Sequence, residues 1–151
     1  MVARAYWDVG GTTMITALRA IESHLERSFA KARKDISGRG ALHTKVRIVD
    51  DVIFVKMRMD YSGLEKNLIR YILEQSEEAN FYASVREQSR FAALKTLQEL
   101  NAELNIKALE FSIDIENNYA FTTIVLTHEL ERLIKEGLVA EPCKAEAIPT
   151  P

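Results

Sequence analysis

The motif Gly38-Arg39-Gly40 combines residue types that can hold an anion. Two glycines allow the backbone to approach a ligand closely, and a guanidinium can hold a carboxylate or phosphate through two parallel hydrogen bonds. The motif lies in a basic stretch, residues 27–47, with seven basic residues and one acidic residue. The alternative is a helix-to-strand turn with a solvated arginine. The candidate anion-binding residues are Gly38, Arg39, Gly40, Lys45, Arg47 and Lys56.

A second motif, WDVGGTT at residues 7–13, contains Asp-x-Gly-Gly-Thr. This pattern is similar to the phosphate-binding turn of actin-like sugar kinases and ATPases. There, however, it joins two strands of a large sheet in much longer, two-domain chains. Here a helical pattern follows at once, so we interpret the motif as a flexible leader that ends in a helix cap.

No set of residues indicates catalysis or metal binding. His128-Glu129 begins like a zinc-protease helix, but Arg132 occupies the place of the second histidine. His24 and His43 stand alone, and Cys143 has no partner thiol in the chain. We therefore expect no enzyme, no catalytic residue, no metal and no cofactor.

Length and composition indicate a single globular domain. The chain has 151 residues, a formal charge of −2 and one cysteine. This charge gives no global field that would recruit nucleic acid, and the lone cysteine suits a reducing compartment. No apolar run approaches membrane-spanning length. We expect a soluble, cytoplasmic protein with no direct membrane insertion, organised as a loose leader (1–11), an α+β domain (12–138) and a disordered tail (139–151).

Hydrophobic periodicity predicts helices that alternate with hairpins. A helix begins at Thr12 or Thr13 and ends at the glycines 38–40. A long helical segment (62–104) either breaks near Asn80 or projects beyond the domain. Hairpins are expected on either side of it, and a last helix over residues 128–136. The order α-β-β-α-β-β-α indicates an α+β two-layer sandwich, with a four-stranded antiparallel sheet and a long central helix.

The hairpin registers follow from where each turn is placed. A two-residue turn at Asp50-Asp51 pairs Val49 with Val52, so that Lys45 faces Lys56. In the second hairpin, a turn at Asn117-Asn118 pairs Glu116 with Tyr119. The remaining predicted pairs of that hairpin are Ile115–Ala120, Asp114–Phe121, Ile113–Thr122, Ser112–Thr123, Phe111–Ile124, Glu110–Val125 and Leu109–Leu126.

The second face of the sheet is both charged and apolar. The pair Lys45–Lys56 is unfavourable unless a negative group lies near. Glu110, Asp114 and Glu116 could neutralise it, or an anionic ligand could. The apolar part of this face is large enough to indicate an interface, covered by the last helix, a second copy or a partner. The acidic third strand argues against nucleic acid. The candidate interface residues are Val52, Phe54, Tyr119, Phe121 and Val125.

Two runs carry a resemblance to a known family: GRGALHTKVRIVDDVIFVKMRMDYSGLEKNL and LNIKALEFSIDIENNYAFTTIVL. The chain resembles the MpsC-like family of small bacterial proteins over residues 15–127, in its Gly-Arg-Gly turn, its acidic hairpin turn and its closing hairpin. Ala41 stands where the family usually has proline. The resemblance implies a non-enzymatic bacterial protein linked to a membrane-potential-generating system associated with inorganic carbon uptake.

Two functional hypotheses follow. The first is a cytoplasmic interaction module, an accessory or regulatory partner of another protein such as a membrane transport protein. It would be a homodimer, with contacts made by the second sheet face and the long helix. The alternative is a small anion- or nucleotide-sensing domain that uses the Gly-Arg-Gly turn and the neighbouring basic strand residues.

Overall fold

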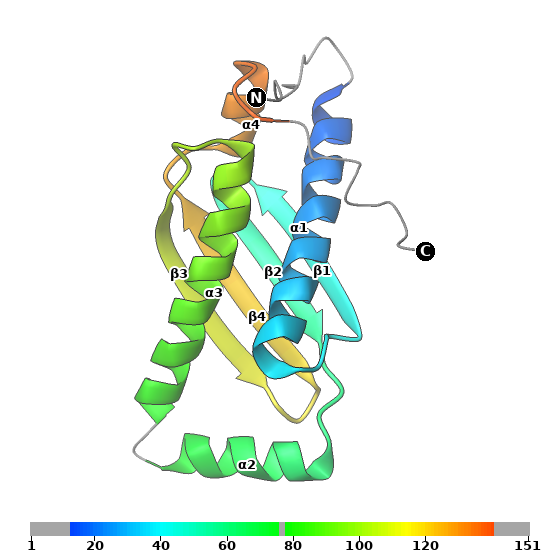
Figure 1. The fold of residues 1–151 in the computed structure, drawn as a ribbon, viewed down its shortest axis with the longest axis vertical. Helices are drawn as coiled ribbons and strands as arrows, with labels where there is room; N and C mark the ends of the chain where they lie inside the picture. The colour runs from blue at the N-terminus through cyan, green and yellow to red at the C-terminus, as the bar shows by residue number, and fades with distance from the viewer. Residues whose placement is uncertain (1–12, 76–77, 141–151) are drawn as a thin grey trace.

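The computed structural model describes residues 13–75 and 78–140 (Figure 1). It contains helices and a four-stranded antiparallel sheet, which confirms the predicted α+β class. The elements in chain order are α1 (Thr13–Ser37), β1 (His43–Val49), β2 (Val52–Arg58), α2 (Gly63–Glu74), α3 (Glu78–Leu100), β3 (Ile106–Asp114), β4 (Tyr119–Leu126) and α4 (Leu130–Lys135).

Helix α1 forms because apolar residues recur every fourth position and bury one face. Ala17, Ile21, Leu25 and Phe29 are all buried. The helix ends at Gly38, whose φ of 75° is the left-handed conformation that glycine adopts at no steric cost. The N–H of Gly38 bonds to the carbonyl of Lys34 at 2.8 Å. The predicted end of this helix is therefore confirmed.

The first hairpin has the predicted register. Val49 pairs with Val52 and Lys45 with Lys56. Asp50 adopts a φ of 56°, the left-handed conformation that a two-residue turn needs. The sheet order is β1-β2-β4-β3. The second hairpin therefore joins the first by pairing β4 with β2, and β1 and β3 are the two edge strands.

The predicted register of the second hairpin is wrong by two residues. Asp114, not Glu116, pairs with Tyr119 and closes a four-residue loop. The Asp114 carboxylate accepts hydrogen bonds from the backbone N–H and the side-chain amide of Asn117, at 3.2 and 2.8 Å. These side-chain bonds stabilise the longer loop, with Asn118 at a φ of 61°. An even shift leaves each side chain on its predicted face.

The predicted long central helix is two helices. Backbone geometry becomes extended at Gln75, which caps α2 at its C-terminal end. Helix α3 then lies along the sheet, whereas α2 lies across its end (Figure 1). A continuous helix of this length would extend well past a domain of this size, so the break is the alternative that keeps α3 packed on the sheet.

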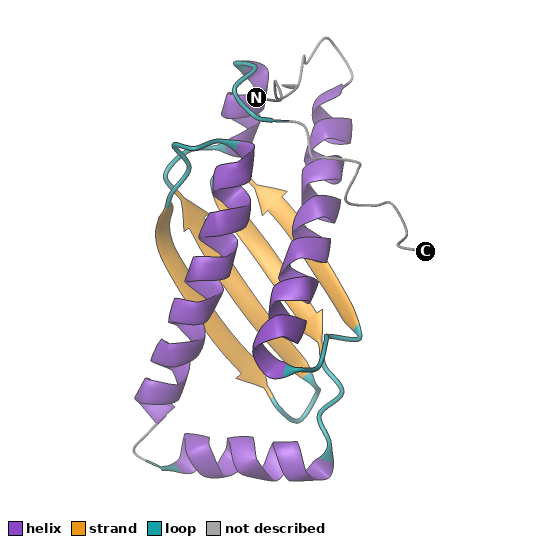
Figure 2. Ribbon diagram, viewed as in Figure 1, coloured by secondary structure: helices purple, strands orange, loops and turns teal. Residues whose placement is uncertain are grey.

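The core lies between one face of the sheet and helices α1 and α3, which run side by side over that face (Figure 2). Helix α4 adds Leu130, Leu133 and Ile134 to the same core. Val139 and Ala140, assigned to the tail from the sequence, are buried, and the N–H of Ala140 bonds to the carbonyl of Leu100. The predicted leader and residues 141–151 lie outside the described residues.

Candidate functional site

The face of the sheet opposite the helices is open to solvent. Strand residues alternate between buried and exposed, and the exposed set includes Phe54 at 47% and Phe121 at 39% of their full accessible surface. The last helix does not cover this face, because its apolar residues pack into the core on the other side. Hence no described element shields the open face, a term we use for the outward side chains of β1–β4.

The five candidate interface residues come together on the open face. Cross-strand pairing places Val52 opposite Val125 on the two central strands. The Tyr119 and Phe121 rings lie 5.8 Å apart between centroids, and the Lys56 ammonium lies 5.7 Å from the Tyr119 ring centroid. These contacts form an apolar and aromatic centre along β2 and β4.

Charge is divided across the open face. Strands β1 and β2 contribute only basic groups, β4 contributes no charge, and β3 contributes two acids, with the exposed Lys107 at its bulge. The cations are Lys45, Arg47, Lys56 and Arg58, and the acids are Glu110 and Asp114. One lateral half of the face is therefore positive and the other negative.

The expected internal neutralisation of Lys45 and Lys56 does not occur. Strand β4 separates β2 from the acidic strand β3. Glu116 pairs instead with Arg70 at 2.6 Å. Within the described residues, neither lysine forms an ion pair with a carboxylate.

The Gly-Arg-Gly turn faces the start of α2 rather than the open face. The guanidinium of Arg39 forms an ion pair with Glu65 and donates a hydrogen bond to the carbonyl of Asp60 at 3.0 Å. The Asp60 carboxylate lies 3.9 Å from the same group. These contacts give Arg39 a structural role, tying the turn to the first residues of α2.

Glu65 also closes a capping box at the start of α2. Its carboxylate accepts the backbone N–H of Ser62 at 3.1 Å, and the Ser62 hydroxyl accepts the N–H of Glu65 at 3.1 Å. The bond from Ser62 holds the pKa of Glu65 below its usual value, and the charge of Arg39 acts in the same direction. The N-terminus of α2 is thus stabilised both by the capping residue Ser62 and by Arg39 of the glycine turn.

Arg47, the third predicted anion-binding cation, turns around the edge of the sheet. Its guanidinium donates to the carbonyl of Val46 at 2.8 Å and lies 4.0 Å from the Glu22 carboxylate of α1. The six predicted anion-binding residues therefore lie in three separate places, with Arg47 alone at the sheet edge. Lys45 and Lys56 stay paired on the open face, and the glycine turn lies elsewhere.

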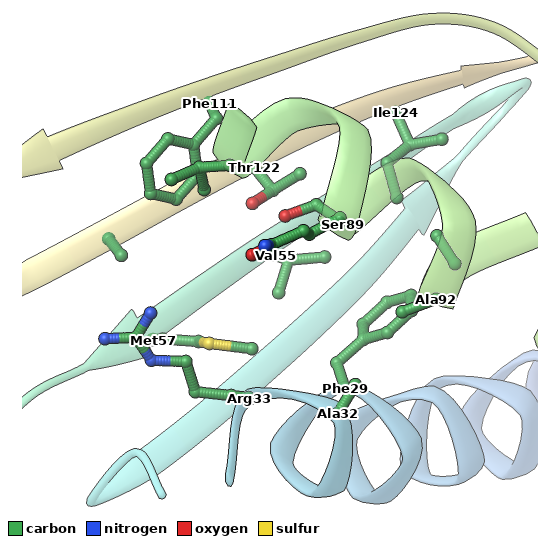
Figure 3. Close-up of a pocket in the computed structure, with 14 residues that line it drawn as sticks. Phe29, Ala32, Arg33, Val55, Met57, Ser89, Ala92, Phe111, Thr122 and Ile124 are labelled. Carbon is green, nitrogen blue, oxygen red and sulfur yellow. The ribbon is translucent and has the colours of Figure 1, made fainter. Parts of the chain in front are cut away.

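A feature that sequence reasoning missed is a cavity of about 90 Å³ between α1, α3 and the core face of the sheet (Figure 3). Its walls are mostly apolar, and Arg33, Ser89 and Thr122 add polar groups. The signal was present as small residues on the sheet-facing side of α3. Their small size also makes the middle of that helix weakly amphipathic.

No helix among the described residues is both long enough and apolar enough to cross a membrane. In the same ranges, no three His, Cys, Asp or Glu side chains are grouped as metal ligands would be.

Comparison with known proteins gives a match to a family model. The model of the MpsC family, described as a Na+-translocating membrane potential-generating system, matches residues 18–128. The chain belongs to the MpsC family. The matched range of this MpsC protein runs from α1 through β4, so it includes the open face and the cavity. No curated protein and no solved structure matches the chain.

Proposed function

We propose that this MpsC protein acts by binding rather than by catalysis, as an accessory subunit that self-associates through its open face. The proposal rests on one observation: an uncovered sheet face with an apolar centre and opposite charges on its two sides. A monomer that exposed such a contiguous patch would be unusual, because large exposed apolar patches mark interaction sites.

The occupant we propose is a second copy of the chain. Two copies can stack face to face about a two-fold axis that lies between the sheets and parallel to the strands. Such a rotation places β1 of one copy over β3 of the other, and β2 over β4, at the same height along the strands. The positive half of each face then meets the negative half of the other.

The register makes this match specific. Arg47 and Glu110 occupy the same row of the sheet, as do Val52 and Val125. In the two-fold pair, Val52 therefore packs over Val125 of the second copy, and the strand position of Arg47, whose guanidinium is turned toward Glu22, lies over its Glu110. Because aligned sheets cross at about −30°, the outer strands meet within about one residue of this register.

The proposed dimer also offsets the electrostatic repulsion between Lys45 and Lys56. Like charges directly opposite each other on a sheet are destabilising. Lys45 lies one row from both Glu110 and Asp114 of the second copy, so dimerisation supplies the negative groups that the single chain does not. A two-fold axis running across the strands would instead bring β1 over β1 and add a second lysine repulsion.

The family description supplies the biological setting of the proposal. We infer that the dimer is an accessory part of a Na+-translocating, membrane-potential-generating system of the kind named for the MpsC family. It would associate with the membrane component of that system from the cytoplasmic side.

The test is the solution mass by light scattering at micromolar concentrations. The intact chain is expected at twice its 17.1 kDa mass, and the double variant Phe54→Glu, Phe121→Glu at the monomer mass. Phe91→Glu is the matched control, because Phe91 is 76% exposed on α3, away from the open face. A monomeric intact chain, or a double variant that remains dimeric, would refute sheet-mediated self-association.

A further inference from the structure

The cavity between α1 and α3 has the composition of a small-molecule site. Val55 and Met57 of β2 form part of its floor, and Phe29 of α1 and Phe111 of β3 lie at its sides (Figure 3). Binding sites are concave and mostly apolar, with a few polar groups that orient the ligand. The cavity is partly open to solvent, so a ligand can enter without unfolding the core.

Small side chains on the sheet-facing side of α3 create the space. Ser89, Ala92 and Ala93 recur at helical spacing where larger residues would fill the layer between helix and sheet. Protein interiors are normally packed without such voids. The hollow therefore follows from the residue types at these positions.

Two hydroxyls line the cavity among apolar groups. Ser89 and Thr122 both carry their side chains into it (Figure 3). Among the described residues, no protein group forms a hydrogen bond with either hydroxyl. Polar groups in such a setting usually bond water or a ligand.

Arg33 places a positive charge at one end of the cavity, beside Met57 (Figure 3). Its guanidinium also bonds to the hydroxyl of Tyr61. A guanidinium has five N–H donors in a planar fork, so it can bond Tyr61 and also hold a carboxylate. The cation is thereby fixed in place beside the apolar walls.

We propose that this cavity binds a short-chain carboxylate, with its alkyl end between α1 and α3 and its acid group at Arg33. The hydroxyls of Ser89 and Thr122 then donate to the carboxylate oxygens or to a bridging water. The cavity volume of about 90 Å³ is smaller than the roughly 150 Å³ of a cavity that holds benzene, so it suits an alkyl group of about three or four carbons.

The test uses the full chain labelled with ¹⁵N and titrated with isovalerate, followed by amide chemical shifts. Saturable shifts are expected at the residues around the cavity in α1, α3 and β4. The neutral analogue isovaleramide, which has the same alkyl group, is expected to bind at least about tenfold more weakly, because it forms no charge-assisted bond with Arg33. This comparison needs no variant.

Two variants sharpen the test. Arg33→Met should weaken isovalerate binding at least about tenfold and leave isovaleramide unchanged. Ala92→Phe should fill the cavity and abolish binding of both compounds, whereas Ala83→Phe, on the exposed side of the same helix, should not.

Three results would overturn the proposal. Absence of saturable shifts with isovalerate would mean that the cavity is not a site for this class. Equal binding of the acid and the amide would mean an apolar site without anion selectivity. Binding that survives Ala92→Phe would place the ligand elsewhere. None of these readouts depends on dimerisation, so they are separate from the test of the open face.

Discussion

The carboxylate of Glu22 on α1 accepts a hydrogen bond from the backbone N–H of Ile48 on β1, at 2.9 Å. One turn further along the helix, Glu26 accepts the N–H of Val46 at the same distance. Both donors point away from β2, on the outer side of an edge strand. Exposed edge donors invite pairing with other chains, so α1 closes this edge with two carboxylates.

Replacement of Glu22 by alanine is expected to lower the free energy of unfolding by about 2 kcal/mol. The buried N–H of Ile48 would lose its charged acceptor, and an unsatisfied buried donor is costly. Urea denaturation followed by circular dichroism measures the change. Glu22→Gln is the control, because its side-chain oxygen still accepts the bond, and it should lose clearly less stability. Equal losses in the two variants would show that the bond to Ile48 is not the source of the effect.

Charge reversal on the open face tests the proposed two-fold axis. Lys45→Glu alone and Glu110→Lys alone should each weaken the dimer by about tenfold or more, since each puts like charges together at two symmetry-related contacts. An equimolar mixture of the two variants should restore dimerisation as a heterodimer, because both contacts become complementary again. Analytical ultracentrifugation of the separate variants and the mixture measures this.

The opposite result is equally informative. If the axis ran across the strands, Lys45 would face Lys45 of the second copy, and Lys45→Glu would only replace a lysine repulsion with a glutamate repulsion. The separate variant would then dimerise about as well as the intact chain, and this result would refute the axis parallel to the strands.

The environment of Tyr61 predicts that the stability of the fold decreases at alkaline pH. Burial raises the pKa of its hydroxyl above the model-peptide value of 10.0, and the charge of Arg33 only partly opposes this. A raised folded-state pKa contributes stability that is complete below pH 10.0 and is lost as the pH rises through the folded-state pKa. Stability should therefore fall over that window.

The measurement is urea denaturation from about pH 9 to about pH 11, for the intact chain and for Tyr61→Phe. Lysines also titrate in this range, so only the difference between the two proteins reports Tyr61. The difference should shrink as the pH rises. A difference that stays constant with pH would contradict a raised pKa for Tyr61.

The sequence was sufficient to predict those features of the fold that depend on residues close together in the chain. The end of α1 follows from Gly38, and the first register follows from the two-residue turn at Asp50-Asp51. The second register failed because Asp114 uses its side chain to hold the loop, and alternation alone cannot separate two registers that differ by two residues. The break after Gln75 carries no glycine or proline signal; it reflects how α3 packs on the sheet.

The features of the candidate surfaces also divide into those that the sequence determines and those that depend on the tertiary structure. The sequence by itself determined the α+β class, the outward set on each strand and the Lys45–Lys56 pair, because side-chain alternation is a local property of a strand. Only the tertiary structure decided that β4 lies between β2 and β3, that Arg39 is held by Glu65, and that a cavity remains under α3. These depend on contacts between residues far apart in the chain, formed when the helices and the sheet bury a common core, and no local pattern encodes them.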